Sequence, residues 1–95
     1  MAAKIEVEQV APYEFHVRVT EGKTVTSHVV TMKTSEYERI SGNKVAPTEL
    51  VHRAFEFLLA RERKESILRK FDVTVIGQYF AEFEQSMKRS LAGKK

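Results

Sequence analysis

Cysteine is absent from this 95-residue chain. Without a thiol, the protein has no disulfide framework, no thiolate nucleophile and no cysteine-based zinc site. No apolar run approaches the roughly 20 residues that cross a bilayer. The first residues also lack the apolar core, about 7–15 residues long, of a secretory signal peptide. These absences predict a soluble protein of the cytoplasm.

Signatures of catalysis and of bound cofactors are missing as well. The sequence contains no G-x-S-x-G elbow, no G-x-x-x-x-G-K-[ST] phosphate loop and no H-E-x-x-H zinc motif. Carboxylate pairs such as Glu36 with Glu38 and Glu82 with Glu84 are two residues apart and do not face each other on a helix. We therefore expect a non-enzymatic protein that uses no cofactor and no metal.

What the chain does contain is the composition of an ordinary globular domain. Hydrophobic residues make up 42% of it and charged residues 31%, which excludes a disordered chain of low hydrophobicity and high net charge. Because 95 residues are too few for two independent cores, we expect a single domain that spans residues 1–95.

Positive charge is concentrated in the second half of the chain. The net charge is +3, and residues 1–46 are neutral overall, so residues 47–95 carry the whole excess. Two basic segments, residues 61–70 and 88–95, lie on either side of a locally acidic stretch. They are either solvated surface or a weak signal for contact with RNA or DNA phosphates. In the second case the candidate residues are Arg61, Arg63, Lys64, Arg69, Lys70, Lys88 and Arg89.

Alternation of apolar and polar residues predicts three strands, over residues 4–10, 13–20 and 24–32. Pro12 interrupts the first pair, because proline has no N–H for the ladder. Gly22 tolerates the positive φ of a tight hairpin. Connections this short predict an antiparallel meander.

The register of the second hairpin has two solutions. A three-residue loop pairs Phe15 with Val29 and places His16 opposite His28, whereas a two-residue loop pairs Phe15 with Val30. We prefer the first, because it matches apolar with apolar side chains better. It would also bring two histidines to one face as potential metal ligands, although two polar residues on a solvated strand face are the simpler interpretation.

Helical spacing of apolar residues begins after the third strand. A short helix is predicted over residues 36–41, with a Ser35–Glu38 capping box at its start and Gly42 at its end. Residues 47–62 carry a broad apolar stripe at helical spacing and predict the most secure helix of the chain. Pro47 suits its first turn, where the missing N–H has no cost.

The last third of the sequence predicts one more long helix. Its apolar seam runs over residues 73–91, with Asp72 as N-cap. Gly77 and a β-branched run weaken its start, so it is one helix or two pieces. Residues 67–71 look like a short buried turn, and residues 92–95 should fray.

Two segments carry a resemblance to a known family. Residues 65–84, with the pattern FD-x-x-VI-x-x-YF-x-E-F-E, and the helix of residues 47–62 resemble a family of short prokaryotic proteins for which no function is established. Several members of that family carry proline at the position of Ala81. The resemblance therefore implies a division of the last helix near that residue, but it implies no catalytic or binding residues.

These patterns predict an α+β fold. A three-stranded antiparallel meander at the N-terminus is followed by three or four helices that pack on one face of the sheet. For function, the sequence favours a small, non-enzymatic binding or interaction module with an unidentified protein partner. The alternative is an RNA- or DNA-contacting accessory protein that uses the basic segments.

Overall fold

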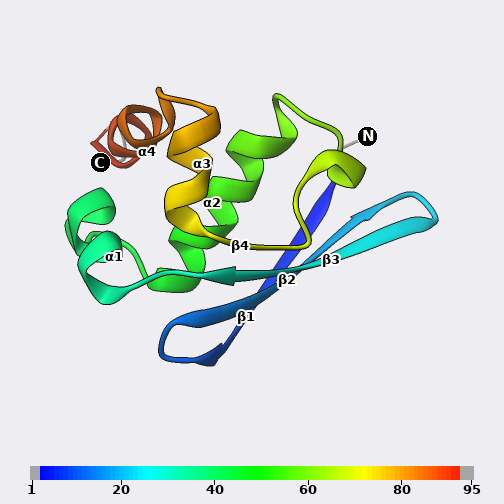
Figure 1. The fold of residues 1–95 in the computed structure, drawn as a ribbon, viewed down its shortest axis with the longest axis horizontal. Coiled ribbons are helices and arrows are strands. Elements are labelled where there is room, and N and C mark those ends of the chain that lie inside the picture. The colour runs from blue at the N-terminus through cyan, green and yellow to red at the C-terminus, as the bar shows by residue number, and fades with distance from the viewer. Residues whose placement is uncertain (1–2, 93–95) are drawn as a thin grey trace.

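The computed structural model describes residues 3–92, in which one sheet is covered on one side by helices (Figure 1). Strands β1 (Lys4–Ala11), β2 (Glu14–Glu21) and β3 (Thr24–Thr31) form the predicted antiparallel meander. The α+β class and the meander are therefore confirmed. None of the helices in these residues is long and apolar enough to cross a membrane.

The β2–β3 hairpin adopts the register that we did not prefer. Phe15 pairs with Val30 and Glu21 with Thr24, which leaves a two-residue loop. Its first residue, Gly22, has φ +59°, as a type II′ turn requires. The three-residue loop was wrong because β3 has apolar residues on both faces. Matching them across the hairpin therefore did not identify the buried face.

A fourth strand, β4 (Lys70–Asp72), extends the sheet beside β3, in the order β1-β2-β3-β4. It pairs with β3 in parallel, with Phe71 opposite Val30. Parallel neighbours need a crossover connection, and the two helices α1 (Thr34–Ser41) and α2 (Pro47–Leu59) lie in it. The predicted buried turn over residues 67–71 is thus partly a strand.

The starts and ends of the first two helices are set by local chemistry. Helix α1 begins at Thr34, so Ser35 lies inside its first turn and the predicted capping box is wrong. The predicted end is right: Gly42 is left-handed, with φ 62°, and its N–H donates to the carbonyl of Glu38. Helix α2 begins with Pro47 as predicted and ends at Leu59, three residues short of the prediction.

The C-terminal segment forms two helices, α3 (Val73–Tyr79) and α4 (Phe83–Ala92), after a short 3-10 helix η1 (Lys64–Ser66). Phe80 separates them with an extended backbone, φ −129° and ψ 96°. Of the two alternatives for this segment, the divided helix is correct. Residues 93–95 of the predicted frayed tail lie outside the described residues.

One cluster of buried side chains joins the sheet to the helices. Helix α2 packs over β1, and the inward-facing side chains of β2 belong to the same cluster. Among its most completely buried members are Phe15, Val17, Val19, Val30, Met32, Leu50, Val51, Ala54, Phe55, Val73 and Phe83. This core fixes α2 and β4 against each other, and the candidate site lies beside their contact.

Candidate binding pocket

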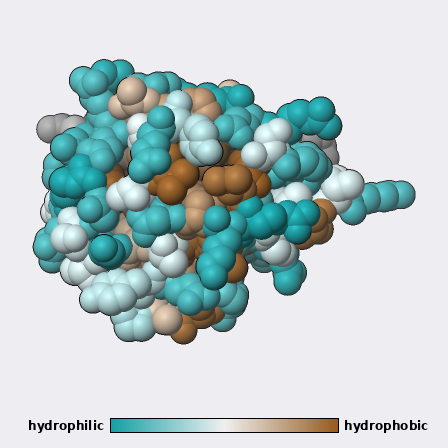
Figure 2. Space-filling model, in the orientation of Figure 1, coloured by the Kyte–Doolittle hydropathy of each residue, from teal (hydrophilic) through white to brown (hydrophobic). Residues whose placement is uncertain are grey.

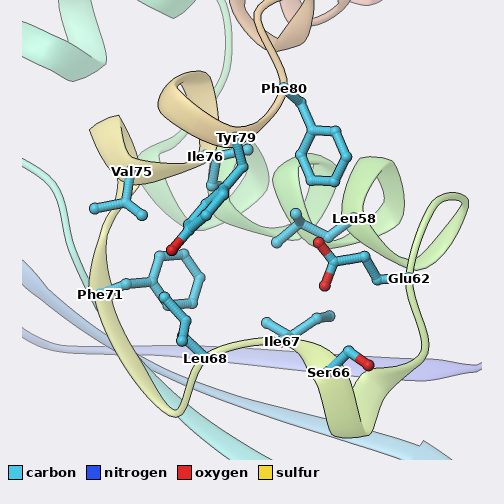
Figure 3. Close-up of a pocket in the computed structure, with 10 residues that line it drawn as sticks. All are labelled: Leu58, Glu62, Ser66, Ile67, Leu68, Phe71, Val75, Ile76, Tyr79 and Phe80. Carbon is cyan, nitrogen blue, oxygen red and sulfur yellow. The ribbon is translucent and has the colours of Figure 1, made fainter.

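An open pocket of about 230 Å³ lies where the end of α2 meets β4 and α3 (Figure 3). Its walls come from the end of α2, the segment of residues 62–68 around η1, strand β4, and α3 with the following Phe80. The lining residues are Leu58, Glu62, Ser66, Ile67, Leu68, Phe71, Val75, Ile76, Tyr79 and Phe80. Eight of these ten have apolar or aromatic side chains, which is the lining typical of a ligand or side-chain binding site.

Helix α3 forms one wall of the pocket, and its start is held by Asp72. The Asp72 carboxylate accepts a hydrogen bond from the backbone N–H of Thr74 at 3.1 Å, which confirms the predicted N-cap. It also accepts hydrogen bonds from the hydroxyl of Thr74 at 2.7 Å and from that of Thr31 in β3 at 2.6 Å. Burial acts to raise the pKa of Asp72, but these hydrogen bonds outweigh it and lower the pKa. The wall is therefore anchored to the sheet as well as capped.

The loop that carries Leu68 is held by a hydrogen bond from a buried histidine of β3. His28 is only 2% exposed. Its Nδ1 lies 2.7 Å from the carbonyl oxygen of Leu68, and its Nε2 lies 2.8 Å from the hydroxyl of Thr26. Burial lowers the pKa of His28, and the nearby charge of Arg69 lowers it further against the opposing effect of the Leu68 carbonyl. The ring is therefore neutral at pH 7 and donates from Nδ1.

Phe80, which lines the pocket, is held in place by other aromatic side chains. Phe57 packs edge-to-face against Phe80, with ring centroids 5.8 Å apart, and against Phe83 at 5.2 Å. The guanidinium of Arg61 covers the Phe57 ring at 3.7 Å and forms an ion pair with Glu82 at 3.2 Å. These contacts tie the end of α2 to the segment that separates α3 from α4.

The mouth of the pocket exposes large apolar side chains. Leu68 is 46% exposed and Tyr79 is 69% exposed, and both line the pocket. Figure 2 shows an apolar patch near the centre of this face, over the region of β4 and α3, with hydrophilic residues around it. Such a patch on a small protein is typical of an interaction surface.

Two of the seven predicted phosphate-contact residues already have partners within the fold. Arg61 stacks on Phe57 and pairs with Glu82. Lys64 is 3% exposed, and its ammonium lies 2.6 Å from a carboxylate oxygen of Glu65 and 3.3 Å from one of Glu21. The hydrogen bond to Glu65, with a smaller one to Glu21, raises the pKa of Lys64. Both charges therefore serve internal contacts.

The other five predicted residues are exposed and form no ion pair with another residue of the described range. They fall into two groups, one near η1 and β4 and one on α4: Arg63, Arg69 and Lys70, and Lys88 and Arg89. Figure 1 places η1 and α4 at opposite ends of the helical layer. Lys94 and Lys95, which end the second basic segment, lie outside the described residues.

The histidines do not come together. His16 is exposed on the outer face of β2, while His28 is buried on the inner face of β3. His28 lies opposite Val17 rather than His16, so the pairing that would have offered two metal ligands is wrong. His52 lies 3.7 Å from Glu56 on the solvent side of α2. Within residues 3–92, no three histidine or acidic side chains are grouped as metal ligands.

The sequence analysis did not identify the pocket, although the signal was present. Five of the six residues in the FD-x-x-VI-x-x-YF pattern line it, and the sixth, Asp72, caps α3. The sequence assigned Leu68 to a buried turn, whereas its side chain is exposed. Only the parallel pairing of β4 with β3 brings residues 67–71 to this position.

The lining side chains can bind but offer little chemistry. Glu62 is the one charged residue among the ten, and Figure 3 shows its carboxylate directed into the pocket. The hydroxyl of Ser66 points away from it in the same view. Nucleophilic catalysis requires a nucleophile held against a base, and these two side chains are not arranged in that way.

Comparisons with known proteins add no assignment to this geometry. No family model, no curated protein sequence and no solved structure matches the chain. The family resemblance of residues 65–84 therefore stays a prediction.

Proposed function

We propose that this protein is a non-enzymatic binding module, and that the pocket beside β4 receives a side chain of a partner protein. The observation that supports this most strongly is the exposure of Leu68 and Tyr79 at the mouth of an apolar cavity. Leaving two large apolar groups in water forgoes their burial energy, roughly 25 cal/mol per Å² of apolar surface. A partner that covers them recovers it.

The support behind the pocket favours binding further. Asp72 anchors α3 to β3, His28 holds the Leu68 carbonyl, and Phe57 holds Phe80. A site whose walls are fixed before the ligand arrives loses less conformational entropy on binding. Aromatic side chains at such a position are typical of the residues that dominate binding energy in protein interfaces.

The test is partner capture from the native host with a matched pair of variants. Tyr79→Ala removes the most exposed aromatic side chain at the pocket, and Tyr13→Ala removes another exposed tyrosine, on the β1–β2 turn away from it. Proteins retained by the tagged wild type should be retained equally by Tyr13→Ala. Tyr79→Ala should lose them by at least about tenfold, the effect of about 1.4 kcal/mol. Equal retention by all three proteins would contradict the proposal.

Contact with RNA or DNA is the second candidate function, and the five unpaired cations support it. Since Arg61 and Lys64 are engaged inside the fold, Arg63 and Arg69 are the better residues to test. If they grip phosphates, affinity should fall with salt, with a log–log slope of about −0.7 to −0.9 per contact. Arg63→Glu with Arg69→Glu should weaken binding to all sequences alike.

The control for this experiment reverses two cations outside both basic segments, Lys23→Glu with Lys44→Glu. Both residues are exposed, so the double variant has the same net charge as the test variant. Equal loss in the two double variants would indicate a general charge effect. If the wild type shows no binding with a Kd below about 100 μM at physiological salt, the nucleic-acid function is excluded. This is the outcome that we expect.

A further inference from the structure

Glu62 has an unusual position among the acidic residues around the pocket. Its neighbours each have a basic partner: Glu65 and Glu21 pair with Lys64, and Glu82 pairs with Arg61. Glu62 forms no ion pair or side-chain hydrogen bond with another residue of the range 3–92. Its carboxylate points into the pocket between Leu58 and Ile67 (Figure 3). The apolar pocket therefore contains a single negative charge that the fold does not neutralise.

The other walls of the pocket favour the same kind of ligand. Three aromatic side chains, Phe71, Tyr79 and Phe80, line it. The face of an aromatic ring attracts a cation, and an ammonium group near several rings is bound more strongly when water is excluded. A pocket that combines one carboxylate with aromatic rings therefore favours an organic cation and disfavours an anionic group such as a phosphate.

The volume of the pocket limits which cation can bind in it. A protein cavity of about 150 Å³ holds one benzene molecule, so the pocket of about 230 Å³ has room for a somewhat larger group. Lysine combines a compact ammonium with a flexible stem of four carbons. The stem can cover apolar surface while the ammonium meets a charge.

We propose that the pocket binds a lysine side chain of the partner protein, with the ammonium at Glu62 and the stem against the apolar walls formed by Leu58 and Ile67. This inference rests on the proposed function and specifies the group that the partner inserts. The aromatic side chains Tyr79 and Phe80 add attraction for the cation. The arginines that adjoin Glu62 in sequence do not compete, because Arg61 is paired with Glu82 and Arg63 is exposed and forms no ion pair with Glu62.

Two small probes test the charge separately from the stem. The ¹⁵N-labelled chain is titrated with Nα-acetyl-lysine methylamide and with Nα-acetyl-norleucine methylamide, which has the same four-carbon stem without the ammonium. The lysine probe should shift the amide signals of Leu68, Gly77 and Tyr79, and its Kd should be at least about fivefold lower than that of the norleucine probe. Tyr79→Ala should weaken both probes.

A matched pair of variants assigns the preference to one carboxylate. Glu62→Gln should remove the preference for lysine, whereas Glu38→Gln, which alters an exposed glutamate on α1, should keep it. A direct measurement on the wild type supports the same point without any variant. The side-chain carboxyl carbon of Glu62 should shift when the lysine probe is added and not when the norleucine probe is added.

The outcomes that overturn the inference differ from those that overturn the proposed function. Equal or tighter binding of norleucine at the pocket, or a lysine preference that survives in Glu62→Gln, would refute the lysine assignment and leave the binding module intact. Equal binding of Nα-acetyl-arginine methylamide would also refute it. Failure of every probe to shift the pocket amides at about 20 mM, together with undiminished partner capture by Tyr79→Ala, would refute both.

Discussion

The Nδ1 atom of His28 lies 2.7 Å from the backbone carbonyl oxygen of Leu68, a residue 40 positions further along the chain. This hydrogen bond joins the inner face of β3 to the loop at the mouth of the pocket. It requires a donor at Nδ1, which the neutral ring supplies while Nε2 accepts from Thr26. The position of Leu68 thus depends on a buried polar group.

The first prediction is that the protein becomes less stable as the pH is lowered, because of His28. Its pKa is lowered below the ordinary value of 6.5, chiefly by burial, so the unfolded chain binds the proton more tightly than the folded one. The free energy of unfolding should therefore decrease as the pH falls below about 7, and level off below the pKa of the folded state. Urea unfolding at pH 7.5, 6.5 and 5.5 measures this.

Two variants isolate the contribution of His28. His28→Asn keeps a donor near the position of Nδ1 but does not titrate, so it should flatten the pH dependence over that interval. His16→Asn, at an exposed histidine on the other face of the sheet, is the control for the loss of a histidine and should leave the stability at pH 7.5 nearly unchanged. The account would be contradicted by a His28→Asn variant with the same pH dependence as the wild type.

A second prediction concerns the ammonium of Lys64, which connects Glu21 at the end of β2 to Glu65 in η1. The raised pKa of Lys64 and the lowered pKa of Glu65 mean that the contact stabilises the fold between about pH 5 and 10. Lys64→Met should destabilise the protein at pH 7 more than Lys4→Met, which breaks an exposed pair and should cost less than about 0.5 kcal/mol.

Coupling between Lys64 and Glu21 can be measured by a double-mutant cycle. The combined variant Lys64→Met with Glu21→Gln should be less destabilised than the sum of the two single variants, because the second change removes the carboxylate left unpaired by the first. Additive effects within experimental error would show that the two side chains do not interact in solution.

The third prediction addresses Asp72, which caps α3 and bonds to Thr31. Asp72→Ala should lower the free energy of unfolding by about 1–2 kcal/mol, the upper range for a lost N-cap. Asp72→Ser retains a capping oxygen and should cost clearly less. If both variants are as stable as the wild type in chemical denaturation, Asp72 does not hold the start of α3.

The fourth prediction concerns Phe55. Its ring centroid lies 5.3 Å from that of His28 and 6.1 Å from that of Phe71. Phe55→Ala should cost about 3–5 kcal/mol, the usual range for a buried phenylalanine, and Val25→Ala, at an exposed position of β3, less than about 0.5 kcal/mol. The proposal of one domain adds that the wild type unfolds in a single transition. A loss below about 1 kcal/mol for Phe55→Ala would contradict the core described above.

Local patterns were sufficient to predict most of the elements but not their long-range contacts. The alternation in residues 4–10 reflects one half-buried face, and the apolar stripe of residues 47–62 reflects one buried face, so they predicted β1 and α2 closely. Strand β4 has only three residues, too few to show a period. Its identity depends on pairing with β3, a contact that no local pattern records.

The burial of His28 shows why side-chain polarity could not predict the register of the β2–β3 hairpin. A polar residue is normally placed on the solvated face, and this rule assigned His28 outward. The ring is buried because Thr26 and the Leu68 carbonyl satisfy both nitrogens, and the second of these partners comes from a distant part of the chain. The pocket was missed for the same reason, since its walls meet only after β4 pairs with β3.

The central claim, that partner proteins bind at the pocket beside β4, is tested most directly by mapping the interface. The amide signals of the ¹⁵N-labelled chain should be recorded with and without the captured partner. The account predicts that the largest chemical-shift changes occur in residues 66–71 and 75–80. Changes concentrated instead on the outer sheet face, at residues 6–8 and 16–18, or on α4 at residues 88 and 89, would contradict it.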